Sequence, residues 1–254
     1  MYKDNFIDIV DLSVHEDLYI GMGNPNAKLL IIGKELALDQ DSQNPVIVKT
    51  NLQNAEDWRT NINNPLMLIP NCENDSQIAD FNPLYPYKGM KKKSQVFGHT
   101  WRKYQLLYEC LTDSQSDEYS FYQGSFITEL NQTPSKYSAL QIDKIRANSI
   151  KKRVDSFFTS DFIQNFPVVI VACGHYPNEN GVDLCEIFKV DFKSPTIHVD
   201  ENPKQWFNLH YSKDEKRPKL LIHTRQLSMN VSNNLIKMIS NEIVDFCNEY
   251  KIEI

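Results

Sequence analysis

Residues 168–172 read VVIVA, an unbroken run of apolar and mostly β-branched residues. Such a run is typical of a β-strand covered on both faces, because a half-exposed strand alternates apolar with polar residues. Comparable runs occur at 28–32 (KLLII), 125–130 (SFITEL) and 219–222 (KLLI), with a weaker one at 195–199 (PTIHV). The sequence therefore predicts a mostly parallel sheet of about four strands.

Helical periodicity appears between and after these runs. Residues 100–111 (TWRKYQLLYECL) place their large apolar side chains on one stripe, and the segments 137–158 and 231–246 repeat apolar residues at helical spacing. Strands that alternate with helices indicate an α/β fold of three layers, α/β/α, around the parallel sheet. The segment 39–97 is rich in Asn, Asp and Pro, which predicts long loops. We find no repeat or linker, and expect a single domain over residues 1–254.

Bulk properties exclude several classes of protein. The net charge is −6, so any attraction for DNA has to come from a local patch. The five cysteines are scattered without a C-x-x-C pair, which argues against a disulfide framework and a zinc site. The phosphate-loop, dinucleotide-binding and zinc-hydrolase motifs are absent from the sequence. No apolar run is long enough to span a bilayer. We expect a cytoplasmic protein with no metal, no cofactor and no membrane partner.

Polar residues follow each predicted strand where parallel strands place their ligands, at the carboxyl edge of the sheet. Glu35 follows the first strand and is a candidate general base, or an acid in the first turn of a helix. Asn131 follows the second, where its amide suits the edge of a base, or begins a turn. His223 follows the last, as a hydrogen-bond donor to a developing oxyanion or as a structural residue.

The ordered set of these turns resembles the uracil-DNA glycosylase superfamily. Its members begin the site with a G-Q-D-P-Y or G-E-x-P-G type motif and finish it with an H-P-S-P-L-S type motif before the last helix. Here LLIIGKELAL, with Gly33 at the turn, is similar to the first motif, and LLIHTRQLSM to the second. FITELNQTP and VVIVACGHY stand between them. The resemblance covers roughly residues 28–247 and implies the same fold.

The resemblance also implies a role for several residues. Glu35 would activate water, Asn131 would read the base, and His223 would stabilise the departing base. Leu227 would fill the gap left by an extruded nucleotide, and Ser228 would contact a phosphate. These types suit the chemistry, since cleavage of an N-glycosidic bond builds positive charge on the sugar and negative charge on the base.

A possible DNA-binding surface is a local basic patch. Its members are Lys91, Lys92, Lys93, Arg102 and Lys103. Basic residues interleaved with aromatics are typical of surfaces that bind a nucleic-acid backbone. A solvated basic loop explains the same pattern equally well.

Three functions remain open from sequence. The first is a base-excision glycosylase acting on uracil or another damaged base. The second is a catalytically inactive protein of the same fold that binds nucleic acid, a nucleotide-like ligand or a protein, since Thr224 and Gln226 replace both prolines of the last motif and Arg225 replaces a small residue. Arg225 itself is a candidate phosphate contact. The third is an unrelated α/β hydrolase-like enzyme that uses Glu35 or His223.

Overall fold

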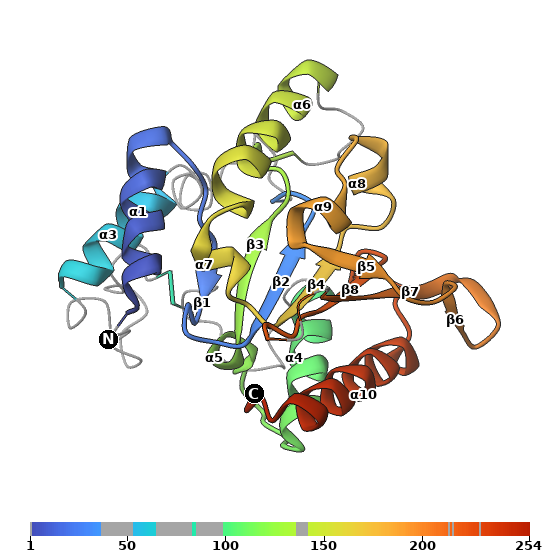
Figure 1. Ribbon diagram of the computed structural model, residues 1–254. Coiled ribbons are helices and arrows are strands. Elements are labelled where there is room, and N and C mark those ends of the chain that lie inside the picture. The colour runs from blue at the N-terminus through green and yellow to red at the C-terminus, as the bar shows by residue number, and fades with distance from the viewer. Residues whose placement is uncertain are drawn as a thin grey trace.

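A computed structural model describes most of the chain, and its strands form one eight-stranded sheet (Figure 1). The described residues are 2–36, 53–64, 83–84, 99–135, 142–212, 214, 216–228 and 230–254. The strands are β1 (Met22–Gly23), β2 (Leu29–Gly33), β3 (Ser125–Glu129), β4 (Val168–Ala172), β5 (Val190–Phe192), β6 (Ile197–Val199), β7 (Asn202–Ser212) and β8 (Leu220–Thr224). Their order in space is β1-β3-β2-β4-β8-β7-β5, and β6 also pairs with β7.

The four strands predicted from apolar runs form the parallel centre of the sheet, in the order β3-β2-β4-β8. Every residue of β2, β4 and β8 is buried, as expected for strands covered on both faces. The expected number of about four strands is wrong, because β1, β5, β6 and β7 extend the sheet on both sides by antiparallel pairing. The weak run at 195–199 is confirmed as part of a strand, β6.

Helices cover both faces of this sheet. They are α1 (Asp4–Glu16), α3 (Asn54–Asn63), α4 (His99–Thr112), α5 (Phe121–Gly124), α6 (Asp143–Lys152), the π-helix η3 (Arg153–Phe158), α7 (Asp161–Gln164), α8 (Tyr176–Glu179), α9 (Leu184–Phe188) and α10 (Asn233–Tyr250). Side chains of α1, α3, η3, α7 and α9 share one apolar cluster with the alternate strand residues Leu30 and Val169. Side chains of α4 and α10 share the other with Leu29 and Ile170. The α/β class predicted from the sequence is therefore confirmed.

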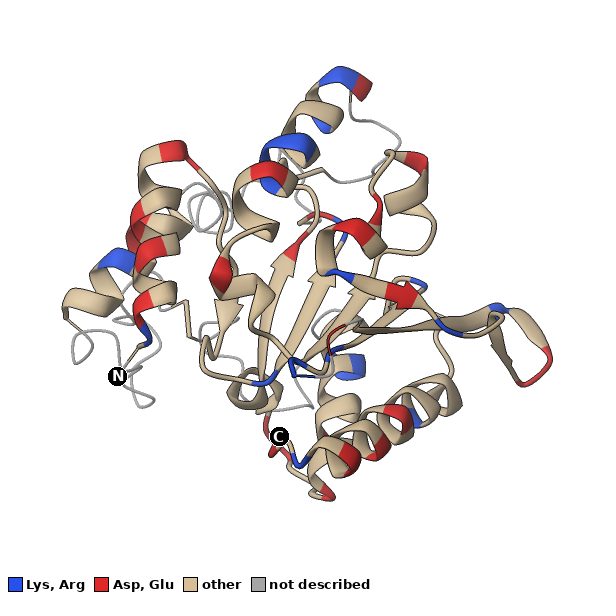
Figure 2. Cartoon of the chain, viewed as in Figure 1, with Lys and Arg blue, Asp and Glu red and all other residues tan. Residues whose placement is uncertain are grey.

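Two of the three predicted helices match well, and one is divided. The stripes over 100–111 and 231–246 become α4 and α10. The segment 137–158 is described from Ile142 onward, where it contains α6 and then widens into η3. Two of its residues at helical spacing, Ile142 and Ile145, do not join the core, since they are 66% and 48% exposed. Basic residues cluster on α6 instead (Figure 2).

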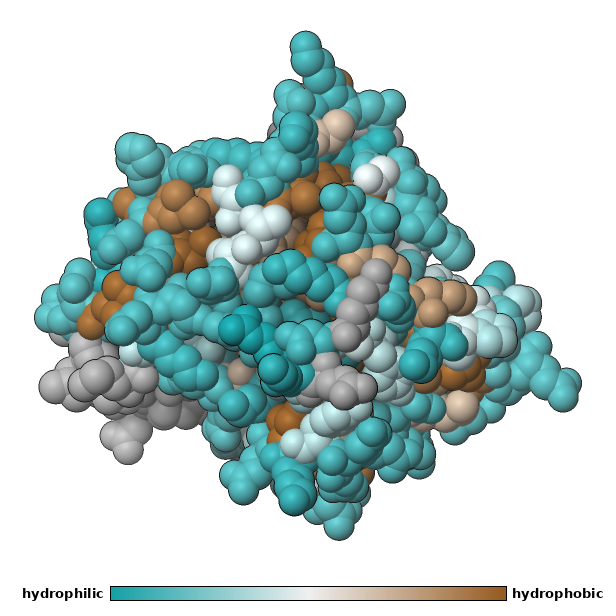
Figure 3. All heavy atoms as spheres, in the orientation of Figure 1, coloured by the Kyte–Doolittle hydropathy of each residue, from teal (hydrophilic) through white to brown (hydrophobic). Residues whose placement is uncertain are grey.

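The outer surface is mixed in character. Hydrophilic side chains cover most of the face seen in Figure 3, and the apolar ones that show lie in separate patches. Among the described residues, no helix combines the length and apolar character needed to cross a membrane.

Candidate functional site

The carboxyl edge of the parallel strands contains a switch in chain direction. From β2 the chain goes to β3 on one side, and from β3 it returns across β2 to β4 on the other. Crevices open at such points, because the two connecting loops diverge. Here the loops after β2 and β4 meet, with Lys34 Nζ 5.3 Å from the centre of the Tyr176 ring. The candidate site starts at this contact.

Two acidic side chains, Glu35 and Glu129, lie beside this contact between the loops after β2 and β4. Glu129 ends β3 directly opposite Gly33 of β2. A Cβ atom placed on Gly33 would lie 2.9 Å from Glu129 Cδ and closer still to Oε2. A glycine is therefore needed at position 33 as long as the Glu129 carboxyl group occupies this place. Glu129 Oε2 is buried and has no hydrogen-bond partner within the described part of the chain.

Glu129 binds its proton more tightly than an ordinary carboxyl group does. Burial, and after it the charge of Glu35, raise the pKa of Glu129 to about 8, against the opposing effect of Arg153. Glu129 therefore keeps its proton at neutral pH. Acids whose pKa is strongly raised by burial and by a neighbouring carboxyl group are common at catalytic sites.

A chain of hydrogen bonds orients Glu35. Ser149 Oγ donates to Asn131 Oδ1 at 2.6 Å, and Asn131 Nδ2 donates to the Tyr176 hydroxyl at 3.1 Å. The Tyr176 hydroxyl in turn donates to the Glu35 carboxylate, and burial followed by the charge of Glu35 raises the pKa of this tyrosine. Each member fixes the next one, so the position of the Glu35 carboxylate is set by buried groups.

Asn131 does not have the placement expected of a residue that reads the base. It is fully buried, and its Oδ1 also accepts from Thr133 N at 3.0 Å. With Nδ2 directed to Tyr176, the amide is used inside the protein and acts on Glu35 through that tyrosine. It is a positioning residue in this structure, whereas a base-reading residue has to present its amide to the ligand.

A second part of the site is an imidazole-lined pocket of about 420 Å³ between β7, β8 and α8. Its lining side chains are His175, Asn178, Thr196, His198, Pro203, Trp206, Asn208 and His223. Trp206 and His223 are buried at its floor, and the others except partly buried Asn208 are exposed at its rim. The size is that of a small-molecule site.

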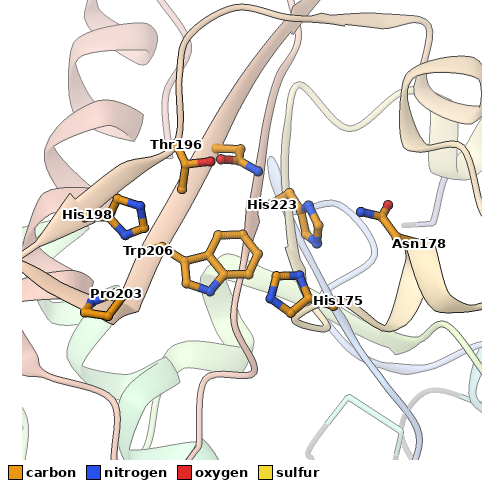
Figure 4. A pocket seen from close by; sticks show the side chains of 8 residues that line it. His175, Asn178, Thr196, His198, Pro203, Trp206 and His223 are labelled. Carbon is orange, nitrogen blue, oxygen red and sulfur yellow. The ribbon is translucent and has the colours of Figure 1, made fainter.

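Aromatic rings shape this floor (Figure 4). The His175 ring stacks on Trp206 with centroids 5.1 Å apart and planes at 15°. The His223 ring meets Trp206 edge-on, at 5.2 Å and 90°. Figure 4 shows both imidazoles on one side of the indole, with His198 and Pro203 on the other. A neighbouring cavity of about 470 Å³ shares Asn208 and His223 and continues along β7 to His210.

His223 connects the pocket to the acidic pair. Its Nε2 lies 2.7 Å from the carbonyl oxygen of Gly174, in the turn after β4. A carbonyl only accepts, so Nε2 carries the proton and donates it. Burial lowers the pKa of His223, and the nearby His210 and His175 lower it further. The ring is therefore neutral at pH 7, and Nδ1 is a bare acceptor. The expectation that His223 donates to the ligand needs correction.

The remaining predicted residues divide between core and loop. Leu227 is 0% exposed and packs in the cluster of α10. The expected wedge role is not supported, because a wedge has to project from the surface. Arg225 Nη1 donates to the Lys204 carbonyl at 2.7 Å, which ties its loop to β7. Ser228 is partly buried, and its backbone N donates to the Gln226 carbonyl at 2.9 Å.

The predicted basic patch is described only in part. Lys91, Lys92 and Lys93 lie outside the described residues. Arg102 is exposed on α4, and Lys103 Nζ donates to Asn233 Oδ1 of α10 at 2.8 Å. DNA binding by this patch remains a prediction.

Compared with family models, curated proteins and solved structures, the chain matches none. The site therefore has to be interpreted from its own residues. Within the described ranges no group of three or more His, Cys, Asp or Glu side chains has the arrangement of a metal site.

Sequence reasoning missed several of these residues. Glu129 carried a usable signal, because it is the acid that ends a buried strand next to Asn131. Trp206 and Asn208 lie in the alternating stretch QWFNLHY, which signals a half-exposed strand rather than a buried one. Tyr176 follows β4 in CGHYP, with no local pattern that indicates its hydrogen bond to Glu35.

Proposed function

We propose that this chain is a metal-independent hydrolase that cleaves the N-glycosidic bond between a base and its sugar in DNA. The observation that carries the proposal is the turn after β4, which holds both parts of the site. Tyr176 donates to Glu35, and Gly174 accepts from His223. Since β2 and β8 flank β4, their backbones are two strand spacings apart, about 9–10 Å. The strand that precedes the Glu35 carboxylate and the strand that carries His223 of the pocket are thus separated by about the length of one nucleoside.

The reaction follows from these positions. The base binds in the imidazole-lined pocket, and its sugar faces Glu35. As the bond to the base breaks, positive charge at C1′ is stabilised by the Glu35 carboxylate. Water adds its oxygen to C1′ and gives a proton to Glu35, while the departing base keeps the bonding electrons and takes a proton from solvent. Protonated Glu129 adds no negative charge of its own to the site.

The test uses the purified full chain with single- and double-stranded oligonucleotides that each contain one uracil, adenine, cytosine or hypoxanthine at a defined site. Alkali cleaves the strand wherever a base has been removed. We expect cleavage at one of these bases that Glu35→Gln reduces by about 100-fold or more, the size of a general-base contribution. The matched control is Glu118→Gln, at an exposed position away from the site. Uncut strands at excess folded protein would contradict the proposal.

A second function is favoured by the placement of Asn131 and Leu227. Both are fully buried, so the residues expected to handle an extruded nucleotide face the protein interior. A binding protein for a free nucleotide-like small molecule needs only the pocket. Binding of a nucleoside without any turnover would identify this alternative.

A further inference from the structure

The wall that β7 and β8 present to the neighbouring cavity of about 470 Å³ carries hydrogen-bond acceptors, and Asn208 and His223 of this wall also line the imidazole-lined pocket. In the antiparallel pairing of these strands, Asn208 is opposite His223 and His210 is opposite Leu221. Residues two apart on a strand point to the same face, so Asn208 and His210 lie side by side with His223. Two residues along a strand span about 7 Å. This is close to the width of one heteroaromatic ring with its substituents.

Each of the three side chains has one nitrogen or oxygen left for a ligand. His223 uses Nε2–H on the Gly174 carbonyl, which leaves Nδ1 as an acceptor. His210 is bonded to the Leu221 backbone, and its buried Nδ1 has no partner in the described part of the protein. Asn208 Oδ1 is also buried, and it too has no partner among the described residues. Buried polar groups without partners are rare in folded proteins and mark places where a ligand or water completes the bonding.

We propose that this wall selects a planar base whose edge donates hydrogen bonds, as the amino groups of adenine and cytosine do, over the carbonyl edge of uracil. The two amino hydrogens are donated to Asn208 Oδ1 and His223 Nδ1, which belong to directly opposite residues of β7 and β8. Uracil offers only one donor on this edge, its N3–H between two carbonyl oxygens. It could satisfy one of the two acceptors, while a carbonyl oxygen would face the other, lone pair against lone pair. The inference deepens the proposed function by naming the class of base, and it rests on that proposal in taking the ligand to be a nucleobase.

The test measures binding, so it does not depend on turnover. The folded full chain and its Glu35→Gln variant are titrated with free adenine, cytosine and uracil, followed by tryptophan fluorescence. We expect adenine or cytosine to bind roughly tenfold or more tightly than uracil, the usual discrimination by a base-edge contact. Equal or tighter binding of uracil, or no binding of any of the three, overturns the proposal. Loss of cleavage with retained binding would contradict only the proposed hydrolase.

Variants at position 208 test the acceptor directly. Asn208→Asp keeps an oxygen acceptor and should retain the preference for an amino base. Asn208→Leu removes the acceptor at similar volume and should reduce affinity for the amino base by about tenfold, with uracil affected less. The opposite result, affinity retained in Asn208→Leu and lost in Asn208→Asp, would show that position 208 does not accept a hydrogen bond from the base, and would overturn the proposal.

The nitrogen that carries the proton in each imidazole ring can be determined on the protein without any substitution. Long-range proton–nitrogen spectra distinguish the two neutral tautomers of histidine. We expect both His223 and His210 to carry their proton on Nε2, with Nδ1 shifting when adenine or cytosine is added. A proton on Nδ1 of His223 would overturn the proposal even if every variant failed to fold.

Discussion

At the scale of the residue, Gly33 and Glu129 depend on each other. Gly33 has no side chain, and this leaves room for the carboxyl group of Glu129, the residue opposite it in the pairing of β2 and β3. Because Glu129 is enclosed in this way next to Glu35, it titrates far from an exposed acid. Both stability and proton uptake should report on this pair.

The stability of the protein should depend on pH through Glu129. Its pKa is raised to about 8 from an ordinary 4.5, so the folded state holds a proton that the unfolded chain has released. The free energy of unfolding therefore falls as pH rises from about 4.5 to 8. We expect Glu129→Gln to flatten this dependence and to gain roughly 2–4 kcal/mol at pH 9 relative to wild type. Urea unfolding across pH measures it, with Glu118→Gln as the control. Parallel curves for wild type and Glu129→Gln would contradict the assignment.

Gly33→Ala should destabilise the protein only when Glu129 is present. The new methyl group overlaps the Glu129 carboxyl group, which is the movable end of its side chain. We expect a cost of about 1–2 kcal/mol in wild type. In a Glu129→Ala background the cost should nearly vanish, because the overlapping atoms are gone. A double-mutant cycle by urea unfolding gives the coupling, and equal costs in both backgrounds would refute it.

At the scale of the element, the π-helix η3 is joined to the sheet by Arg153. This residue is 0% exposed, and its guanidinium donates to the Tyr19 carbonyl and, at 2.8 Å, to Thr128 Oγ1 of β3. It also lies 4.4 Å and 5.1 Å from the ring centres of Phe157 and Phe158. A planar cation is needed here, since it bonds at its edge and stacks on its faces.

Arg153→Lys should therefore be strongly destabilising although it keeps the charge. An ammonium group is too compact to reach both acceptors and contact both rings. We expect a loss of about 3 kcal/mol in the free energy of unfolding. Arg102→Lys on exposed α4 is the matched control and should change stability by less than about 0.5 kcal/mol. A small effect at position 153 would mean that packing of η3 does not depend on the guanidinium.

The sequence predicted the central elements because their signal is local. Continuous apolar runs identify β2, β3, β4 and β8, whose residues are all buried except Glu129 at the end of β3, which is partly buried. The long strand β7 was missed because it contains no continuous apolar run like those of the central strands, and its pairing with β5, β6 and β8 joins distant segments.

The candidate site was predicted in position but only partly in chemistry. Glu35 and His223 do lie at the carboxyl edge, as the strand ends require. Which ring nitrogen of His223 carries the proton depends on the carbonyl of Gly174. The hydrogen bonds that the Asn131 amide makes depend on Ser149 and Tyr176. Such partners come from other segments, so residue types and spacing alone do not define them.

At the scale of the whole molecule, the sheet has a protected centre and exposed margins. β2 and β4 each have strands on both sides and an apolar cluster on both faces. The margins end in short β1 and β5, and Phe192 of β5 is 53% exposed.

Native-state hydrogen exchange should follow this arrangement. Amides of β2, β4 and β8 should exchange slowest, at the free energy of global unfolding, because opening them breaks both clusters. Amides of β1, β5 and β6 should exchange much faster through local opening. Mass spectrometry of peptides after deuterium labelling measures both groups, and equal protection of β5 and β4 would contradict a single protected centre.

The turn after β4 connects the two parts of the site, the imidazole-lined pocket and the acidic pair. Within three residues it bonds His223 through Gly174 and Glu35 through Tyr176. A ligand that shifts this turn on entering the imidazole-lined pocket also alters the surroundings of the acidic pair. Thermodynamic reciprocity then requires the converse, so that the proton on Glu129 changes ligand affinity by the same factor by which the ligand changes proton affinity. Proton release on binding, measured by calorimetry in buffers of different ionisation enthalpy, would report this linkage directly.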